Sequence, residues 1–568
     1  MMRLLRITVF SLLFSSPLAG LAAQERPFEW DNVERIVAIG DIHGAYDNLV
    51  RVLQNANLID NKLRWKGGAA HLVQTGDIVD RGPDSRKAMD LLMKLEDKAE
   101  DAGGWVHVLI GNHEAMNVVG ILDLVSAKEY KAFVDRDSRK RRDRTFARYY
   151  EQLRREARER GEDPPKKSVI RKEFDKDYPL GFVEHRHAFS SDGKYGKWIQ
   201  GHNATIKING IIFSHGDWSE KFSEMDVAEL NRRIRQELRG ESPIQEGITF
   251  DTESPLQYRG LAQTELTKAA QESTLPLVER ILRNLGAKRM VVGHTVTGGI
   301  IESRFGGKHI SIDTGMLELY RGGHRIALEI VNDEIRAIHD GGTIPVPESM
   351  NAENLGAYLH AVAEVDPTNV DVQLKRVDAM GEEGRLDEAV PILESLIEHK
   401  ATHIPFRYRE LLGVQYLERG DTARAEAQFR AYIDRLSTLV KSNPSNLNLA
   451  NLLARFCADK GLEIDLAEKV IASAIEQAPD TYSFRLTMAR VRIAKDEFSK
   501  VFEVLDVPDA PSGPFAYDTN YLYGLAYVGL DQRDKARAAF QKAINAQPAD
   551  SDRQEAREAL KGLGASPN

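Results

Sequence analysis

Five short apolar runs place the strongest constraint on how the first part of this chain folds. They cover residues 33–40, 71–76, 105–111, 211–215 and 290–293. Each run is rich in β-branched residues and closes on a glycine or a polar residue, which is typical of a buried strand that leads into a loop. Helical patterns lie between the runs, and residues 310–313 and 326–331 predict two further strands. This alternation predicts an α/β domain whose functional side chains lie in the loops at the strand ends.

From about residue 350 the strand pattern stops and a helical repeat takes its place. Three copies share positions, namely Gly524, Tyr527, Ala536, Phe540, Ala543 and Pro548 in the last, Gly413, Tyr416, Ala425 and Phe429 in an earlier one, and Ala467, Ala474 and Pro479 in a third. Small residues let the two helices of a repeat approach closely, aromatic residues fill the space between repeats, and proline ends the second helix. These are tetratricopeptide offsets, so residues 350–568 are predicted to form an all-α tetratricopeptide-like solenoid of about four to five repeats.

The length and the charge balance limit the functions that are open to the chain. At 568 residues it exceeds one ordinary core, so two or three domains are expected. The formal net charge of −9 argues against a general nucleic-acid binder, because phosphate backbones attract basic faces. Cys457 is the single cysteine, which excludes an internal disulfide framework.

Residues 1–23 have the order of features found in a secretory signal peptide. Arg3 and Arg6 form a short basic region, and the apolar stretch at residues 7–14 is much too short to span a bilayer. Small residues then lead to Ala22 and Ala23, where cleavage is expected. The alternative is an uncleaved amphipathic anchor. A secreted protein without a membrane span is predicted, periplasmic if the host is Gram-negative.

The first domain, residues 24–345, contains a predicted helical insertion at about residues 124–181. This segment is long and charged, with a basic run at residues 136–144, and Pro164 and Pro165 interrupt its helical pattern. One interpretation is a solvated helical insertion over the face that carries the loops. The other is that the insertion selects an anionic substrate.

Five short motifs rich in Gly, Asp, Asn and His follow the five strands. They are GDIHG at 40–44, GDIVDRG at 76–82, GNHE at 111–114, SHG at 214–216 and GHT at 293–295. Because each motif follows a predicted strand, all five can converge on one edge of the sheet. The glycines permit tight turns and close approach of the backbone. Together the motifs indicate one shared site rather than isolated structural histidines.

The side chains of these motifs suit a pair of divalent metal ions. Two ions about 3.5–4 Å apart bind phosphoryl oxygens and acidify a shared water, which overcomes the repulsion between a phosphate ester and hydroxide. Such a pair needs oxygen and imidazole ligands with a bridging carboxylate, and Mn, Fe or Zn suits this set. The predicted ligands are Asp41, His43 and Asp77 for one ion and Asp77, Asn112, His215 and His294 for the other, with Asp77 as the bridge.

The motifs resemble those of the phosphoprotein phosphatase branch of the calcineurin-like metallophosphoesterases. The extension Asp80-Arg81-Gly82 is more diagnostic of that branch than the metal ligands are. SPLQYRG at residues 254–260 and IDTGM at 312–316 are similar to motifs of the Shewanella-like protein phosphatases. The resemblance covers roughly residues 33–332 and implies an α/β metallophosphoesterase fold, a central β-sandwich flanked by helices.

The resemblance also implies roles for residues beyond the metal ligands. His113 would be the general acid that protonates the leaving oxygen, and Asp80 would orient its imidazole. Arg81 and Arg259, with Asn112, would bind the phosphoryl oxygens, a task that suits guanidinium groups. The sequence departs from the family pattern at Asp217, where glycine is usual, and this change is expected to add a negative charge close to the site.

Hydrolysis of phosphomonoesters, with phosphorylated Ser, Thr or Tyr of proteins as the leading substrates, is the function that these features predict. A second possibility within the same chemistry is hydrolysis of small phosphorylated metabolites or dinucleoside polyphosphates. A third, from another class, is a repeat scaffold with an inactive head, against which the complete set of site residues speaks. The concave surface of the repeats offers a site for a protein partner.

Overall fold

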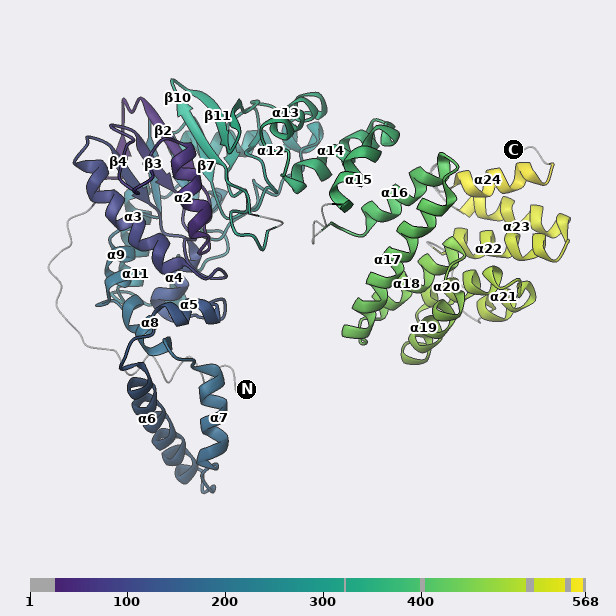
Figure 1. Ribbon diagram of the computed structural model, residues 1–568, viewed down its shortest axis with the longest axis horizontal. Helices are drawn as coiled ribbons and strands as arrows, with labels where there is room; N and C mark the ends of the chain where they lie inside the picture. Colours follow the sequence, from purple (N-terminus) through teal and green to yellow (C-terminus); the bar gives the residue numbers. More distant parts are fainter. Residues whose placement is uncertain (1–25, 321–322, 399–403, 507–514, 547–552, 565–568) are drawn as a thin grey trace. The chain divides into compact units, whose positions relative to one another are not determined.

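The computed structural model describes residues 26–320, 323–398, 404–506, 515–546 and 553–564. The predicted signal peptide, residues 1–23, lies outside the described residues. The chain divides into two compact units, Met1–Arg385 and Leu386–Asn568 (Figure 1). Within the described residues no helix is long and apolar enough to span a membrane.

Two six-stranded sheets form the centre of the first unit. One sheet has the order β1-β5-β6-β7-β9-β8 and the other β12-β11-β10-β2-β3-β4. The strands are β1 (Glu29–Trp30), β2 (Arg35–Ile39), β3 (His71–Gln74), β4 (Trp105–Val108), β5 (Thr205–Ile208), β6 (Ile211–Ser214), β7 (Arg289–Val292), β8 (Glu302–Arg304), β9 (His309–Ser311), β10 (Ala327–Val331), β11 (Glu334–His339) and β12 (Gly342–Pro345). Ala38 on β2, Phe213 on β6 and Ile310 on β9 belong to one buried cluster, so the sheets share a core. The predicted β-sandwich is confirmed.

The strand register places the functional loops side by side. In the second sheet β2, β3 and β4 are parallel, with Ile39 opposite Gln74 and Gln74 opposite Val108. In the first sheet β6 and β7 are parallel, with Ser214 opposite Val292. The loops that carry the five motifs follow these strand ends. In each sheet, therefore, the loops that carry the motifs lie together at one edge.

Helices cover the two sheets and bury their apolar faces in a second cluster. These helices are α2 (Tyr46–Asn55), α3 (Ser85–Glu100), α4 (Asn112–Val119), α10 (Glu220–Ser223), α11 (Val227–Leu238) and α12 (Lys268–Asn284), with a short 3₁₀ helix, η1 (Ile244–Glu246). Leu49 of α2, Leu92 of α3 and Ile234 of α11 are fully buried in this cluster. The helical flanks predicted for the sandwich are therefore present.

The insertion after α4 is helical, as the sequence predicted. The predicted range, about residues 124–181, contains α5 (Ala127–Ala132), α6 (Ser138–Glu159) and α7 (Lys167–Asp177). Two more helices, α8 (Phe182–Phe189) and α9 (Lys194–Gln200), follow it. Helices α6 and α7 form a hairpin that extends from the body of the first unit (Figure 1). Phe146 of α6 packs against Phe174 of α7 with ring centroids 5.3 Å apart, and Pro164 and Pro165 lie in the turn between the helices.

Two helices that follow the last strand pack against the sheets and not among the repeats. They are α13 (Ala352–Val365) and α14 (Val370–Glu382). Leu359 and Val362 of α13 and Val372 of α14 are fully buried in the cluster between the sheets. The first unit thus continues to Arg385, whereas the sequence predicted the repeats from residue 350.

The second unit consists of helices throughout its described residues. They are α15 (Val390–Glu398), α16 (Arg407–Glu418), α17 (Thr422–Ser442), α18 (Leu447–Lys460), α19 (Ile464–Gln477), α20 (Tyr482–Ala494), α21 (Phe498–Leu505), α22 (Ala516–Gly529), α23 (Arg533–Ala546) and α24 (Arg553–Gly562), preceded by a 3₁₀ turn, η2 (Leu386–Ala389). A Cβ added at Gly413 would lie 2.4 Å from Cε1 of Phe429, and one at Gly524 would lie 2.3 Å from Cε1 of Phe540. The glycines therefore let the two helices of a repeat approach closely, as predicted, and the aromatic ring of the second helix packs on them. Pro548 lies outside the described residues. The all-α, tetratricopeptide-like architecture is confirmed.

Candidate metal centre

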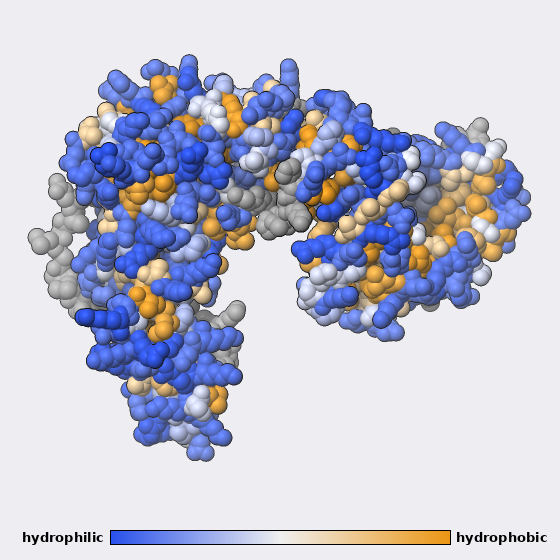
Figure 2. All heavy atoms as spheres, in the orientation of Figure 1, coloured by the Kyte–Doolittle hydropathy of each residue, from blue (hydrophilic) through white to orange (hydrophobic). Residues whose placement is uncertain are grey.

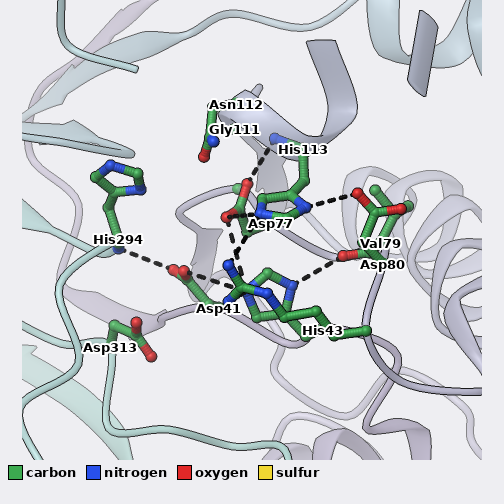
Figure 3. A network of polar contacts seen from close by, with 12 residues as sticks. Asp41, His43, Asp77, Val79, Asp80, Gly111, Asn112, His113, His294 and Asp313 are labelled. Atoms are coloured by element: carbon green, nitrogen blue, oxygen red, sulfur yellow. Dashed lines mark hydrogen bonds and ion pairs between the residues drawn. The ribbon is translucent and has the colours of Figure 1, made fainter. Parts of the chain in front are cut away.

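The loops after the strands bring the side chains of the five motifs into one cluster. Among them, Figure 3 labels Asp41, His43, Asp77, Asn112, His113 and His294. Several of these residues have a left-handed backbone that non-glycine residues rarely adopt. The φ angle is 46° at His43, 58° at Asp77, 71° at Asp80, 65° at Arg81 and 64° at His294. Such strain persists only where the surrounding structure enforces it, and it concentrates at functional sites. The fold therefore holds these loops in place at an energetic cost.

Asp77 lies at the centre of the cluster, surrounded by imidazoles. Its Oδ2 atom is 3.7 Å from Nε2 of His43, 3.7 Å from Nε2 of His113 and 3.4 Å from Nε2 of His215. These separations fall outside the usual range of hydrogen bonds, and they suit ligands arranged around a shared cation. Burial alone would raise the pKa of Asp77, but the nearby imidazoles, His215 first, hold it well below its ordinary value. Asp77 therefore stays ionised, as a bridging carboxylate requires.

Further carboxyl groups crowd around Asp77. Burial, followed by repulsion from Asp313 and Asp77, raises the pKa of Asp41 well above its ordinary value. Burial and the charge of Asp77 raise the pKa of Glu114 to about 7, and burial raises that of Asp313 to about 6. So many buried acids repel one another unless positive charge is supplied. The donor set of carboxylates, imidazoles and an amide fits two divalent cations of the Mn, Fe or Zn type.

The remaining predicted ligands lie at the same centre. Nε2 of His43 is 3.8 Å from Oδ2 of Asp41. The side-chain amide of Asn112 lies 2.9 Å from Nε2 of His215. Asp77, His215 and His294 form one group whose candidate ligand atoms lie within 4.8 Å of one another, and His43, Asp77 and His113 form another. The structure thus brings together all six residues predicted as ligands.

His113 and Asp80 form a buried pair next to this cluster. Nδ1 of His113 lies 2.6 Å from Oδ2 of Asp80, and Nδ2 of Asn117 donates to Oδ1 of Asp80 at 2.8 Å. Burial would lower the pKa of His113, but the carboxylates of Asp77 and Asp80 raise it above its ordinary value overall. A protonated imidazole whose orientation is fixed by a carboxylate is what a general acid needs. The geometry therefore agrees with the roles that the family resemblance implied.

Replacing His113 by Asn should slow the reaction by about 10²–10⁴-fold on alkyl phosphates, the range that general acids contribute. The loss should be much smaller on p-nitrophenyl phosphate, because nitrophenolate leaves without protonation. Steady-state rates on both substrates, with metal content measured in parallel, give the comparison. An equal loss on the two esters would contradict the general-acid role and leave His113 as a positioning residue.

Both predicted phosphate-binding arginines reach the cluster. Nη1 of Arg81 lies 2.8 Å from Nε2 of His43 and also contacts the hydroxyl of Tyr320. Arg259 donates to the carbonyl of His294, and its Nη2 lies 3.2 Å from Nδ1 of that residue. The two guanidinium groups therefore approach the metal-ligand cluster from two different loops. Such an arrangement can bind a phosphoryl group from two directions.

Asp217, the departure from the family pattern that follows the SHG motif, is buried and has partners outside the predicted ligand set. The residue is 1% exposed, and its carboxylate accepts hydrogen bonds from the backbone N–H groups of Leu261 and Ala262, both at 2.8 Å. The other oxygen lies 2.7 Å from Nε2 of His309. The side chain therefore fixes the loop that carries Arg259.

Four residues support the site without having been assigned a role from the sequence. Glu114 accepts hydrogen bonds from the backbone N–H groups of Asp77 at 2.7 Å and Gly111 at 2.9 Å, which ties two motif loops together. Asn117 follows His113 by one helical turn on α4, and that spacing could have revealed it. Asp313, which contacts Asp41, lies in the IDTGM motif, and that motif could have revealed it. Tyr320 contacts Arg81 from a segment far along the chain, and no local signal marks it.

The fold and the cluster define a metallophosphoesterase, and comparison with known proteins agrees with this class. Residues 34–298 match the calcineurin-like phosphoesterase family, and residues 518–550 match the tetratricopeptide repeat family. Shewanella-like protein phosphatase 2 of Arabidopsis thaliana is 30% identical over 58% of this chain and 82% of its own length. Shewanella-like protein phosphatase 1 of Plasmodium berghei is 26% identical over 51% of this chain and 69% of its own length.

Among solved structures, a cold-active protein tyrosine phosphatase matches with 24% sequence identity and a TM-score of 0.43, covering 58% of this chain and 83% of that one. The sequence matches place the chain in a family. It belongs to the Shewanella-like protein phosphatases within the calcineurin-like phosphoesterases. The chain is therefore a hydrolase of the phosphatase type, and the alternative of an inactive head on a repeat scaffold is set aside.

Proposed function

We propose that this chain is a secreted, metal-dependent phosphatase that removes phosphoryl groups from Ser, Thr or Tyr side chains of proteins. The observation that carries the proposal is the arrangement around Asp77. Three imidazole nitrogens lie within 3.7 Å of its Oδ2 atom, and the pair formed by His113 and Asp80 lies alongside. Phosphomonoester hydrolysis needs these groups together.

Each group in the cluster has a distinct task in this chemistry. Arg81 and Arg259 bind the phosphoryl oxygens and orient the ester, because guanidinium groups match the geometry of phosphate. When two divalent metal ions are bound, they neutralise the phosphoryl oxygens and make water acidic enough to supply hydroxide. His113, held by Asp80, delivers its proton to the leaving oxygen. A substrate with a poor leaving group, such as a serine phosphate, depends most on that proton.

Two observations support proteins as the substrates. The Arabidopsis and Plasmodium relatives are called protein phosphatases. The second unit is built from stacked helix pairs, and such surfaces commonly receive an extended peptide or a helix of another protein. Small phosphorylated metabolites and dinucleoside polyphosphates remain the alternative within the same chemistry.

An activity panel tests the proposal. The purified, metal-analysed enzyme is given phosphoserine, phosphothreonine and phosphotyrosine peptides, mononucleotides and dinucleoside tetraphosphates at matched concentrations. We expect kcat/KM on at least one phosphopeptide class to exceed that on every nucleotide by about tenfold or more, a difference of roughly 1.4 kcal/mol in transition-state binding. Higher efficiency on the nucleotides would favour the alternative.

Secretion rests on residues 1–23, whose order of basic, apolar and small residues is that of a signal peptide. In a Gram-negative host the protein would then act in the periplasm. Sequencing the N-terminus of the protein purified from its natural host tests this proposal. A start at Ala23 or Gln24 is expected, and an intact N-terminus would contradict it.

A further inference from the structure

The hairpin of α6 and α7 carries a charge opposite to that of the whole chain. Residues 136–177 contain sixteen Lys and Arg and ten Asp and Glu, a net charge of +6, whereas the full chain has −9. The visible surface of this hairpin is mostly hydrophilic (Figure 2). A positively charged element on an acidic protein attracts anionic partners and repels cationic ones.

The positive charge of α6 is concentrated on one face. At 100° per residue, five basic side chains fall within about 80° of one another and span about 27 Å along the axis. They are Lys140, Arg144, Arg148, Arg155 and Arg158, all exposed, and together they make up what we call the basic face. Phe146 and Ala157, 4% and 2% exposed, occupy the opposite side, where the hairpin is closed by α7. The basic face therefore points away from the hairpin's own core.

Several charged neighbours of the basic face are paired, whereas its own five side chains have no such pair in the part of the chain that the structure describes. Arg141 pairs with Glu184 and Asp135, and Arg142 lies 3.6 Å from Asp175. Glu151 is the one acidic residue within the same arc of α6, and Arg154 already pairs with it at 2.9 Å. Among the residues that the structure describes, the basic face has no hydrogen bond or ion pair through its side chains. Like charges one turn apart destabilise a helix, so an anionic partner would stabilise α6.

The base of the insertion is hydrogen-bonded to the loop of residues 76–82, which carries Arg81 and is the phosphate-binding loop. Before the hairpin, the carbonyl of Leu124 accepts a hydrogen bond from the backbone N–H of Arg81 at 3.0 Å, and Oγ of Ser126 donates to the carbonyl of Gly82 at 3.0 Å. After the hairpin, Arg186 donates to the carbonyl of Asn117 at 2.6 Å. A ligand held along α6 is thus bound to an element that is joined directly to the phosphate-binding loop.

We propose that the basic face of α6 docks an acidic segment of a polypeptide, which under the proposed function is part of the phosphoprotein substrate. An acidic polypeptide supplies carboxylates at intervals along an extended chain, which suits a row of long basic side chains. A membrane suits this face less, because amphipathic helices that bind bilayers present an apolar face, and that of α6 is buried against α7. The chain's net negative charge opposes nucleic acid.

Charge reversal on the basic face tests the proposal in the full-length enzyme. The variant combines Lys140→Glu, Arg144→Glu and Arg148→Glu. The control combines Lys62→Glu, Lys66→Glu and Lys94→Glu, three exposed lysines of the same unit that change the net charge equally. Substrates are p-nitrophenyl phosphate and two phosphopeptides with the same phosphosite, one flanked by glutamates and one by neutral residues. An unphosphorylated glutamate-rich peptide, labelled with a fluorophore, measures binding alone.

We expect the test variant to raise KM for the acidic phosphopeptide by about fivefold or more, since several exposed ion pairs are lost at once. Its rates on the neutral peptide and on p-nitrophenyl phosphate, and its melting curve, should match those of the wild type. The wild-type preference for the acidic peptide should shrink between about 0.03 and 0.3 M salt, because screening shortens the reach of exposed charges. The control variant should retain that preference.

Equal KM values for the acidic and neutral peptides in the wild type would overturn the docking surface while leaving the proposed function intact. If the enzyme hydrolyses no phosphopeptide, but the labelled acidic peptide binds the wild type and not the test variant, the docking surface stands and the proposed substrate class falls. The basic face could instead be required for binding to vesicles of anionic phospholipid while the peptide does not bind. That result would overturn the proposal and show that the partner of the basic face is a membrane.

Discussion

Asp77→Asn should abolish turnover and remove bound metal. Oδ2 of Asp77 lies 3.4 Å from Nε2 of His215 and 3.7 Å from Nε2 of His43, and Asp77 belongs to both groups of candidate ligands, so its carboxylate would hold both ions. A neutral amide cannot balance two divalent cations. Residues that only support metal ligands cost about 10–100-fold when lost, so this bridging residue should cost more than ~10²-fold. Elemental analysis and rates on p-nitrophenyl phosphate check the expectation.

Asp217→Asn is a matched control, because Asp217 is also a buried aspartate of the first unit. Its carboxylate contacts the backbone of Leu261 and Ala262 and the ring of His309, and none of these residues is a predicted ligand. This variant should keep its full metal content, although the loop of Arg259 loosens and KM rises. If Asp77→Asn retains two metals and near-normal activity, the assignment of Asp77 as the bridge is wrong.

The site could be predicted from the sequence to the extent that its residues follow strands. Asp41 comes two residues after β2, and Asp77 comes three residues after β3. Parallel pairing of β2 and β3 then brings these loops to one edge, so strand and motif together were sufficient. The assignment of these residues as metal ligands came from their chemistry, because carboxylates and imidazoles mixed in this way have few roles other than metal binding.

What escaped prediction depends on contacts between distant parts of the chain. Asp217 has His309 and the backbone after residue 260 as its partners, and the residues next to Asp217 in the sequence carry no sign of either. The amphipathic pattern of α13 looks the same whether its apolar face meets a repeat or a sheet. Periodicity shows that a helix has an apolar face, but the partner of that face is a tertiary property.

The burial of α13 and α14 predicts where the chain can be divided. Tyr358, Leu359 and Val362 are 4%, 0% and 0% exposed, and they belong to the cluster between the two sheets. Full burial of such side chains contributes about 1.5–3 kcal/mol each, so their removal approaches the total stability of about 5–15 kcal/mol of an ordinary domain. A chain that ends after Pro345 should therefore fail to fold cooperatively.

Helix α14 also reaches the loops of the metal centre. Nε2 of His324 lies 3.0 Å from Oδ2 of Asp371, and Nδ2 of Asn369 donates to the carbonyl of Gly299 at 2.9 Å. Gly299 follows the GHT motif that contains His294, and His324 follows the segment of Asp313 and Tyr320. Loss of α14 would thus leave buried polar groups without partners in two loops of the site, each costing about 1–3 kcal/mol.

A chain that ends after Arg385 keeps both helices and should behave differently. We expect it to melt cooperatively, to bind its full complement of metal and to hydrolyse p-nitrophenyl phosphate at close to the full-length rate, because every residue of the site and of its supporting core lies in the first unit. Melting curves, elemental analysis and rates for the two shortened chains and the full-length protein decide the matter. Equal, cooperative melting of the chain that ends after Pro345 would show that α13 and α14 are dispensable. Collapse of the chain that ends after Arg385 would show that the repeats are required for the catalytic unit to fold.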